Sequence, residues 1–548
     1  MRQAQSSVVG IILAAALFAA PLVAAAAEAP AAKPALTGTV TGPDGAPMEG
    51  VVVSATQPAA TITISVVSDN TGTYRFPAGK LAPGRYFLDI RATGYDLAGD
   101  GAAAVAAGKT AMVDLKLKPT HDLAAQLTNA DWLTSFPGTD QQKLPLLACT
   151  GCHTLERIAR STHNETEWLA TIKRMASYAQ ESSPLKPQKT EDSFLGRTPP
   201  EVLQHLAAYL ASVNLSQGPE WKYPLKVMPR VSGRDTHVVV TEYKLPQVFE
   251  PHDVILDNKG TVWFSDFVEL KLGSLNPKTG KVTEYPLPLR KPGAPVGELD
   301  IETAGAHDLV LGMTWQATIA RFDTNTKKFN FYPIPAAAND KNAQLIMTTN
   351  RADVDGKVWT DNGGAPHQFY RIDLKTGQTE KFGPFPHTSY GLAADSHDNL
   401  YFADFGNDTI GRVDAKTGQA TFFQTPTKMS RPRRGHMDAQ DRFWFAEFNT
   451  NAIGMLDPKS GKISEWQVPT PWTAPYDAVL DKDGEVWTGG MTTDRVVRLD
   501  PKTGQSVEYP LPDDTNIRRV FVDNRTTPPT LWTGSNHGAA IVKVEPLD

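Results

Sequence analysis

The hydrophobic and polar positions of this chain follow three patterns in succession. Between residues 36 and 95, short alternating segments are separated by Gly, Pro and Asp, which is typical of β-strands joined by tight turns. Residues 122–216 change to the spacing of amphipathic helices, and from about residue 231 alternating strands return and continue to the C-terminus. The chain is therefore predicted to be multidomain and mainly β, with a small helical domain between two β domains.

The first β region, residues 35–118, is predicted to be a β-sandwich, because its short strands recur at the spacing of such folds. The segments Gly38-Thr-Val, Asp69-Asn-Thr-Gly-Thr-Tyr-Arg-Phe and Pro83-Gly-Arg-Tyr make it similar to the carboxypeptidase regulatory-like domain. That resemblance implies a spacer or contact module, and no metal or nucleophile constellation occurs in the segment.

Two amphipathic helices are expected in residues 122–216. Trp168, Leu169, Ile172 and Met175 fall on one face of a helix over 165–175. A second helix over 199–210 begins with proline, which suits the first helical turn.

The C-terminal region, residues 231–548, repeats a unit of about 40 to 50 residues. Each unit holds an Asp or Asn before a turn that is usually Lys-Thr-Gly; the first of these is Asn276, and Asp323, Asp373, Asp414, Asp457 and Asp500 follow. Each unit also holds a strand with an aromatic residue at a recurring position: Trp263, Trp315, Trp359, Tyr401, Trp444, Trp487 and Trp532. The repeat predicts a seven-bladed β-propeller. The strand at 241–246 is expected to close the ring by pairing with residues 541–544.

The only two cysteines lie in Cys149-Thr-Gly-Cys152-His153, and C-x-x-C-H is the attachment motif of haem c. A structural zinc site needs further ligands that are missing, and the surroundings do not suit a thioredoxin-like motif. With the two helices, residues 122–216 resemble single-haem cytochrome c domains. The resemblance implies one haem c with His153 as the proximal axial ligand and Met175 as the distal one; Met228 and His163 are alternatives.

The first 27 residues predict a signal peptide, since Arg2 precedes a short apolar run and a stretch of alanines. No later segment is apolar enough to cross a membrane. Because haem c is attached outside the cytoplasm, we expect a soluble periplasmic protein whose partner is a periplasmic electron-transfer protein. The formal net charge of −6 gives no sign of nucleic-acid binding.

The repeats resemble the virginiamycin B lyase (streptogramin lyase) propellers, best in residues 408–414 and 444–457. The resemblance implies a histidine general base and a magnesium ion held by acids. Glu250-Pro-His252 and Asp266 match its Glu-x-His and second acid, with Asp in place of Glu. His307 is the candidate for the second catalytic histidine.

Counting from the aromatic of each unit predicts which side chains surround the channel mouth. The candidates for binding a small-molecule substrate are Tyr390, Arg433, Tyr476 and Arg518. The count gives Asp266, Asp404 and Glu447 as candidate ligands for Mg²⁺ or another divalent cation, and the resemblance adds Glu250. Such a ring suits an anionic or hydroxylated small molecule.

Three functions fit these features. The leading hypothesis is a periplasmic redox enzyme or electron-transfer component, in which the propeller binds a small molecule, His252 accepts a proton and electrons pass to the haem. The alternatives are a metal-dependent carbon–oxygen lyase and a non-enzymatic electron-transfer or sensing protein. We expect an oxidoreductase rather than a lyase, since a lyase needs no haem.

Overall fold

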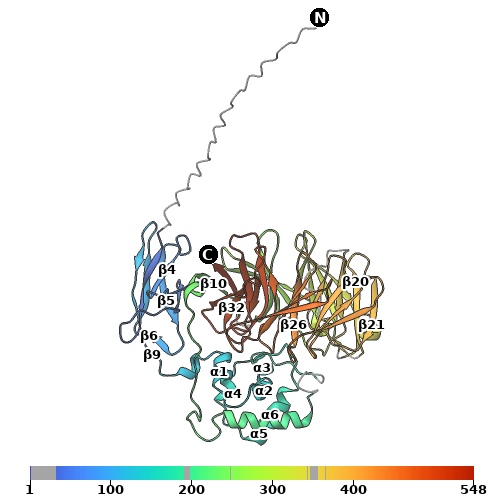
Figure 1. Ribbon diagram of the computed structural model, residues 1–548, viewed down its shortest axis with the longest axis horizontal. Helices are drawn as coiled ribbons and strands as arrows, with labels where there is room; N and C mark the ends of the chain where they lie inside the picture. The colour runs from blue at the N-terminus through green and yellow to red at the C-terminus, as the bar shows by residue number, and fades with distance from the viewer. Residues whose placement is uncertain (2–32, 191–197, 247–248, 342, 346–355, 365) are drawn as a thin grey trace.

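The computed structural model describes residues 1, 33–190, 198–246, 249–341, 343–345, 356–364 and 366–548 (Figure 1). The predicted signal peptide at 1–27 lies, apart from Met1, outside the described residues. The described chain is mainly β and forms a small β-sandwich, a propeller and a layer of helices against one end of the propeller (Figure 1).

The N-terminal region is a β-sandwich, as the alternating pattern predicted. One sheet has the order β4-β1-β9-β6, with β8 also paired to β1; the other contributes β3-β2-β5-β7. The strands are β1 Leu36–Thr41, β2 Val52–Thr56, β3 Ile62–Val67, β4 Thr73–Phe76, β5 Gly84–Arg91, β6 Tyr95–Leu97, β7 Gly101–Val105, β8 Ala111–Met112 and β9 Leu115–Pro119. The fully buried Tyr74 donates its hydroxyl to the carbonyl of Val113 at 2.6 Å, which ties the two ends of the domain together.

Helices follow at the positions where the helical pattern was found. They are α1 Asn129–Ser135, α2 Asp140–Lys143, α3 Leu146–Cys149, α4 Glu156–Ala159, α5 Glu165–Met175 and α6 Pro200–Val213. Asn164 and Glu167 form a capping box at the start of α5, and α6 begins with Pro200. Among the described helices, none combines the length and the apolar character that a membrane crossing requires.

Six separate sheets of the propeller follow one another along the chain. They are β11 Pro251–Leu256 to β14 Lys281–Pro286, β15 Ile301–Ala304 to β18 Lys328–Pro333, β19 Lys357–Asp361 to β21 Thr379–Phe385, β22 Leu392–Ala394 to β25 Ala420–Gln424, β26 Pro432–Met437 to β29 Lys462–Gln467, and β30 Val479–Leu480 to β33 Ser506–Pro510. The Asp or Asn of each repeat accepts a backbone N–H two residues later, as Asp373 does from Lys375 at 2.8 Å.

The seventh blade closes the ring in the predicted way. β10 Val238–Lys244 pairs antiparallel with β36 Ala540–Pro546, in the register Thr241 to Lys543 and Tyr243 to Ile541, beside β35 Thr530–Ser535 and β34 Ile517–Asp523. The other edge of β10 pairs with β3 of the sandwich, Val239 opposite Val66. The sandwich and the closing blade therefore share one eight-stranded sheet.

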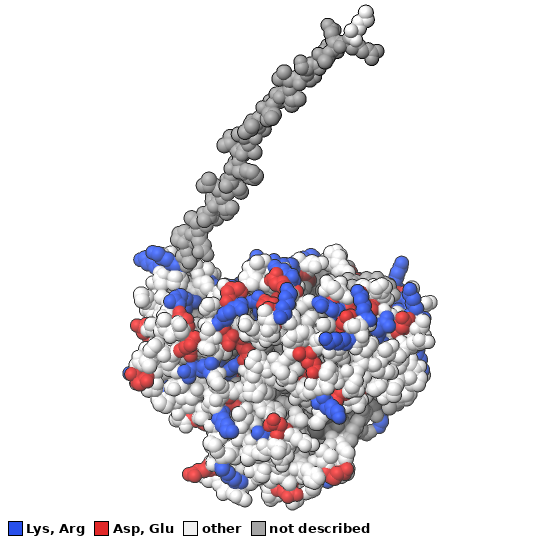
Figure 2. All heavy atoms as spheres, in the orientation of Figure 1, with Lys and Arg blue, Asp and Glu red and all other residues white. Residues whose placement is uncertain are grey.

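The helical layer and one end of the propeller share a hydrophobic core. Buried Trp132, Leu133 and Leu147 belong to the same cluster as Tyr476 and Met491 of the propeller. Figure 1 shows the helices against a single end of the propeller. Figure 2 shows that basic and acidic side chains are interspersed over the visible face of the sandwich and propeller. The contact between the helices and this end of the propeller therefore includes a continuous apolar core.

Candidate functional site

The side chains predicted at the mouth of the propeller converge under the helical layer. We call this end, where β11, β26 and β34 begin, the mouth. His252, Arg433 and Arg518 come from these strands, while Tyr390 and Tyr476 precede β22 and β30. The Arg433 guanidinium lies 3.9 Å from the ring centre of Tyr476 and 4.9 Å from that of Tyr390, and Arg518 lies 5.6 Å from the Tyr476 ring.

His252 is the fully buried centre of this group. Its Nδ1 lies 2.7 Å from Asp253 Oδ1, its Nε2 lies 3.2 Å from the Tyr476 hydroxyl, and its ring packs 4.7 Å from that of Phe267. Burial lowers the pKa of His252 to about 4, although Asp253 opposes the shift. The imidazole is therefore neutral at pH 7, with Nδ1 protonated toward Asp253 and Nε2 free to accept the proton of Tyr476.

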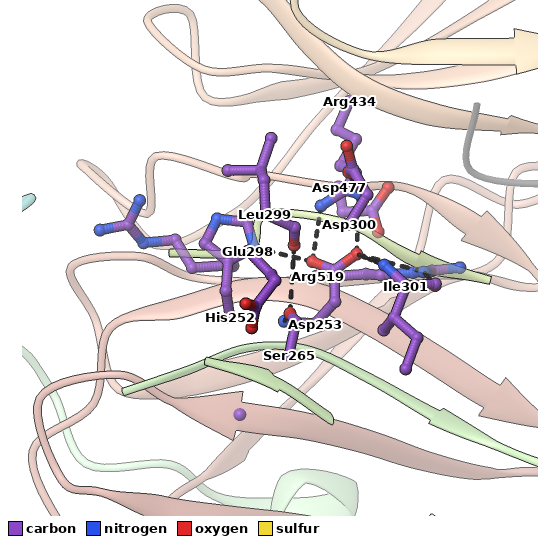
Figure 3. A network of polar contacts seen from close by, with 12 residues as sticks. His252, Asp253, Ser265, Glu298, Leu299, Asp300, Ile301, Arg434, Asp477 and Arg519 are labelled. Atoms are coloured by element: carbon purple, nitrogen blue, oxygen red, sulfur yellow. Dashed lines mark hydrogen bonds and ion pairs between the residues drawn. The ribbon is translucent and has the colours of Figure 1, made fainter. Parts of the chain in front are cut away.

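A buried ionic network lies directly behind His252 (Figure 3). Arg434 binds Asp253 through two hydrogen bonds of 2.8 Å and also binds Asp300, while Arg519 lies 3.2 Å from Asp253. Burial alone would raise the pKa of Asp253, but the charge of Arg434 and the hydrogen bond from His252 hold it below the ordinary range. Asp253 is thus an anion that fixes the tautomer of His252.

These network residues were not predicted, because a bulge changes the alternation of the innermost strands. The pairing shifts between Pro251 and Val254, between Pro432 and Gly435, and between Ile517 and Val520. A bulge turns successive side chains toward the same region, so both members of the pairs His252/Asp253, Arg433/Arg434 and Arg518/Arg519 line the axis. The visible signal was the recurrence of two adjacent polar residues at the start of three blades.

The acids predicted as metal ligands make different local contacts. Asp404 accepts hydrogen bonds from His387 at 2.8 Å and Thr388 at 2.7 Å, and Glu447 accepts one from Thr450 at 2.9 Å. Within the described residues, no group of three His, Cys, Asp or Glu side chains is placed to hold a metal ion. The metal site expected from Glu250, Asp266, Asp404 and Glu447 therefore stays a prediction: Asp404 binds polar groups of its own blade, while Oε1 of Glu447 is buried without a hydrogen-bond partner in the described part of the chain.

Asp266 and Glu298 instead form a buried pair of acids beside Glu250. The backbone N–H of Asp266 donates to Glu298 at 3.4 Å, while Oδ2 of Asp266 and Oε1 of Glu298 have no hydrogen-bond partner in the described part of the chain. Burial raises the pKa of Asp266 to about 7 and that of Glu298 well above its usual range. At least one carboxyl group of this pair is therefore protonated at neutral pH.

His307 lies away from the mouth, which corrects its assignment as a catalytic residue. It is exposed in the turn that joins β15 to β16 Asp308–Met313. The equivalent turn of the preceding blade, between its first two strands, is formed by residues 257–261. The error comes from Trp315, which was aligned with the strand tryptophans but lies in a 3₁₀ turn after β16 and donates to Glu181. The alignment of His307 with His252 required a shortened hairpin between His307 and Trp315, but the structure has the single strand β16 there.

A loop from the helical region reaches this blade. Tyr178 and Lys189 bridge its two ends, so we call it the 178–189 loop. The side chain of Gln188 bonds both the N–H of Val296 at 2.7 Å and its carbonyl at 2.8 Å. Burial raises the pKa of Glu181, which holds Trp315, to about 7. The loop thus contacts the backbone two residues before Glu298.

The Cys-x-x-Cys-His segment lies against the same mouth. Asn516 Nδ2 donates to the carbonyl of Thr150 at 3.0 Å, and Arg518 Nη2 donates to that of Gly151 at 2.9 Å. Both cysteines are free and partly buried. His153 Nδ1 lies 3.0 Å from the carbonyl of Thr154, which orients the ring and leaves Nε2 for another partner.

The candidates for a distal haem ligand differ in their surroundings. Met175 is the partly buried last residue of α5. His163 packs on Trp168 and lies 3.7 Å from Glu167, and the Met228 N–H binds Asp131 in a cleft toward the sandwich. Sequence reasoning left out His537, whose buried Nε2 has no partner in the described part of the chain. Burial, with the charges of Arg518 and His153, lowers the pKa of His537 to about 3.

Comparisons with known proteins identify two parts of this chain. Residues 296–546 match the model of the virginiamycin B lyase family, and residues 35–118 match that of the carboxypeptidase regulatory-like domain. No curated protein matches the chain.

Among solved structures, a streptogramin B lyase is similar at 20% identity and a TM-score of 0.49, over 57% of this chain and 100% of that one. Virginiamycin B lyase from Staphylococcus aureus is similar at 22% identity and a TM-score of 0.48, over 56% and 98% of the two chains. A catalytically inactive form of that enzyme with quinupristin gives 22% identity and a TM-score of 0.49, over the same shares. By the two family models, this chain contains a carboxypeptidase regulatory-like domain and, in its propeller, a virginiamycin B lyase-like domain.

Proposed function

We propose that the mouth of the propeller is the active site of a lyase that eliminates an oxygen leaving group from a small molecule. The observation that carries the proposal is the buried, neutral His252, held by Asp253 and bonded to Tyr476. A base of this kind can take a carbon-bound proton at neutral pH. The lyase-like family of the propeller favours this chemistry over the redox reaction expected from the sequence.

In the proposed reaction, the Tyr476 oxygen takes the proton next to the substrate's activating group, while the Tyr476 proton passes to Nε2 of His252. The electron pair of the broken C–H bond forms a C=C bond, and the C–O bond breaks. Asp253 stabilises the imidazolium that results. The leaving oxygen then takes a proton back from the His252–Tyr476 pair, so that the enzyme returns to its starting state.

The first test uses quinupristin, the compound named with the Staphylococcus enzyme. Elimination in a ring ester opens the ring without a change in mass, whereas hydrolysis adds the mass of water. We expect an isomeric product with a new double bond, detected by mass spectrometry and NMR, from the wild type but not from Tyr476→Phe or His252→Asn. A hydrolysed product, or full turnover by His252→Asn, overturns the mechanism; a panel of other oxygen esters extends the search if quinupristin is not turned over.

We propose a second function, attachment of one haem c at residues 149–153. The two free thiols and the oriented His153 fit the group: Cys149 and Cys152 would form the thioethers, His153 Nε2 would bind the iron, and Met175 would be the distal ligand. Burial lowers the pKa of His153, so its ring is neutral as a metal ligand requires. Bound haem supplies one-electron transfer.

This second function implies export to the periplasm and a periplasmic electron-transfer partner. The test is expression of the full chain with the haem c maturation machinery, followed by a haem stain after denaturation. Stain that persists in the wild type and disappears in Cys149→Ala/Cys152→Ala supports covalent attachment, and its absence from mature wild type overturns it. Met175→Ala is expected to remove the methionine–iron charge-transfer band.

A further inference from the structure

Arg433 is a buried cation enclosed by aromatic rings. Its side chain is 7% exposed. The guanidinium carbon lies 3.9 Å from the ring centre of Tyr476 and 4.4, 4.8 and 4.9 Å from those of Phe448, Phe405 and Tyr390. The faces of four rings offset part of the cost of removing the charge from water, but they cannot replace a counter-ion.

No carboxylate is paired with Arg433 in the described part of the chain. Its hydrogen bonds are weak: Nη1 donates to the thioether Sδ of Met491 at 3.6 Å, and Nη2 lies 3.5 Å from the Tyr390 hydroxyl, while its buried Nε has no partner. The adjacent Arg434, by contrast, is paired with both Asp253 and Asp300. Of these two neighbouring buried arginines, Arg434 has carboxylate partners and Arg433 has none in the described part of the chain.

The surroundings of Arg433 are positive as well. Burial and the charge of Arg433 lower the pKa of Arg431 to about 10, and Arg431 lies 4.0 Å from the centre of the Phe405 ring that Arg433 also contacts. Arg518 lies on the Tyr476 ring. An anion that entered this region would gain from more than one cation, and an uncharged molecule would not.

We infer that Arg433 anchors the carboxylate group of a ligand, with Tyr390, Phe405 and Tyr476 packing against the apolar part of that ligand. The inference rests on the proposed function, since it names the substrate class of the same site: an organic acid, or an ester that carries a free carboxylate. A guanidinium with a free Nε and poorly engaged Nη atoms can bind a carboxylate through two parallel hydrogen bonds.

A carboxylate at Arg433 could also belong to the haem proposed above, because the Cys149 loop contacts this mouth. The chemistry of recognition is the same in both cases. The two sources differ in their dependence on Cys149 and Cys152, so they are separated by comparing protein with and without these thiols.

The experiment is calorimetric titration of the full-length protein with benzoate, and with benzamide as the uncharged analogue. We expect benzoate to bind about tenfold or more tightly than benzamide. Arg433→Gln should abolish this preference, Arg433→Lys should keep part of it, and Arg85→Gln, at an exposed arginine of the sandwich, should leave it unchanged. Equal binding of the two compounds to the wild type overturns the inference without any variant, as does unchanged benzoate binding by a folded Arg433→Gln.

Two further arms separate the outcomes. Benzoate binding by both haem-loaded wild type and Cys149→Ala/Cys152→Ala supports a free carboxylate ligand; binding only after removal of the thiols overturns that ligand in favour of the haem's own carboxylate. His252→Asn should still bind benzoate. If binding depends on Arg433 while no ester is eliminated by the wild type, the carboxylate site stands and the proposed lyase reaction falls.

Discussion

Arg518 donates a hydrogen bond from Nη2 to the carbonyl oxygen of Gly151, between the only two cysteines of the chain, while its guanidinium lies over the rings of Phe267 and Tyr476. One side chain of the last blade thus contacts both the Cys-x-x-Cys-His loop and the residue that hydrogen-bonds to His252. The two proposed sites are neighbours, and a change in one should be measurable at the other.

Replacement of Arg518 by Gln should loosen this contact. The lost charge-assisted hydrogen bond leaves the Gly151 carbonyl without its partner, at a cost of about 1–3 kcal/mol. We expect faster amide hydrogen exchange over residues 149–153, with little change in the sandwich. Exchange that remains at the wild-type rate would show that apolar packing alone holds the loop.

Replacement of Arg434 by Met should destabilise the protein by about 3–5 kcal/mol, because Asp253 and Asp300 would remain as buried charges without their main partner. The charge of Arg434 lowers the pKa of His252. The variant should therefore show a higher His252 pKa in an NMR titration, which simple loss of packing would not produce. The control is Arg442→Met. Arg442 is a partly exposed arginine in the turn before β27 Phe443–Glu447.

The acid side of the pH–rate profile should reflect His252. Since its folded-state pKa is about 4, the base stays neutral, and the reaction rate should stay level, from pH 7 down to about pH 5. If the base were an ordinary exposed histidine, it would become protonated below about pH 6.5, and the reaction rate would already fall there. Initial rates distinguish the two cases when they are measured from about pH 4 to about pH 8 with an ester that the wild-type protein eliminates.

Asp266→Asn should stabilise the protein in alkaline solution. The pKa of Asp266 is raised to about 7 in the fold, whereas the unfolded carboxyl ionises near its ordinary value of 3.8. As the pH rises between these values, the unfolded state loses its proton first, so folding becomes less favourable, by up to about 4 kcal/mol above pH 7. The amide removes this penalty.

Urea unfolding at about pH 4 and pH 8 checks the prediction. The difference between Asp266→Asn and the wild type should be small at the lower pH and large at the higher one. Asp44→Asn, in an exposed turn of the sandwich, is the matched control. A variant that is equally destabilised at both values would mean that the aspartate is needed in its ionised form.

Gln188→Ala should release the 178–189 loop from the propeller. The side chain provides both hydrogen bonds to the backbone of Val296, each contributing about 1 kcal/mol. We expect the Val296 amide to exchange about tenfold faster and the loop to become sensitive to limited proteolysis, while Glu220→Ala, in the exposed segment after α6, leaves both unchanged.

Much of this arrangement could be predicted from the sequence. The repeat of Asp or Asn with a turn fixed the order of the blades, and the alternating segment at 241–246 identified the closing strand. The convergence of Tyr390, Arg433, Tyr476 and Arg518 was predicted correctly. In each of their blades the aromatic residue lies in the second strand, so counting back from it reaches the start of the blade. These predictions depended on local periodicity, which the fold preserves.

The other features of the site could not be predicted, because they break the repeating pattern of the sequence or lie outside it. A bulge at the start of β11, β26 and β34 brought Asp253, Arg434 and Arg519 to the axis, and an aromatic residue outside its strand, Trp315, misplaced His307. The docking of the Cys149 loop on Asn516 and Arg518 joins residues more than 300 positions apart. Such long-range contacts follow from packing between domains, for which the sequence offers no repeating pattern.

The shared sheet of β3, β10 and β36 has a consequence for the order in which the chain can fold as it is synthesised. The sandwich is complete long before the last blade leaves the ribosome, so β10 can already lie along β3 while the blades between are still being made. It then presents a single free edge, of fixed register, to β36. The N-terminal domain thus acts as a template that holds the first propeller strand ready for the last, and ring closure becomes the addition of one strand to an existing sheet.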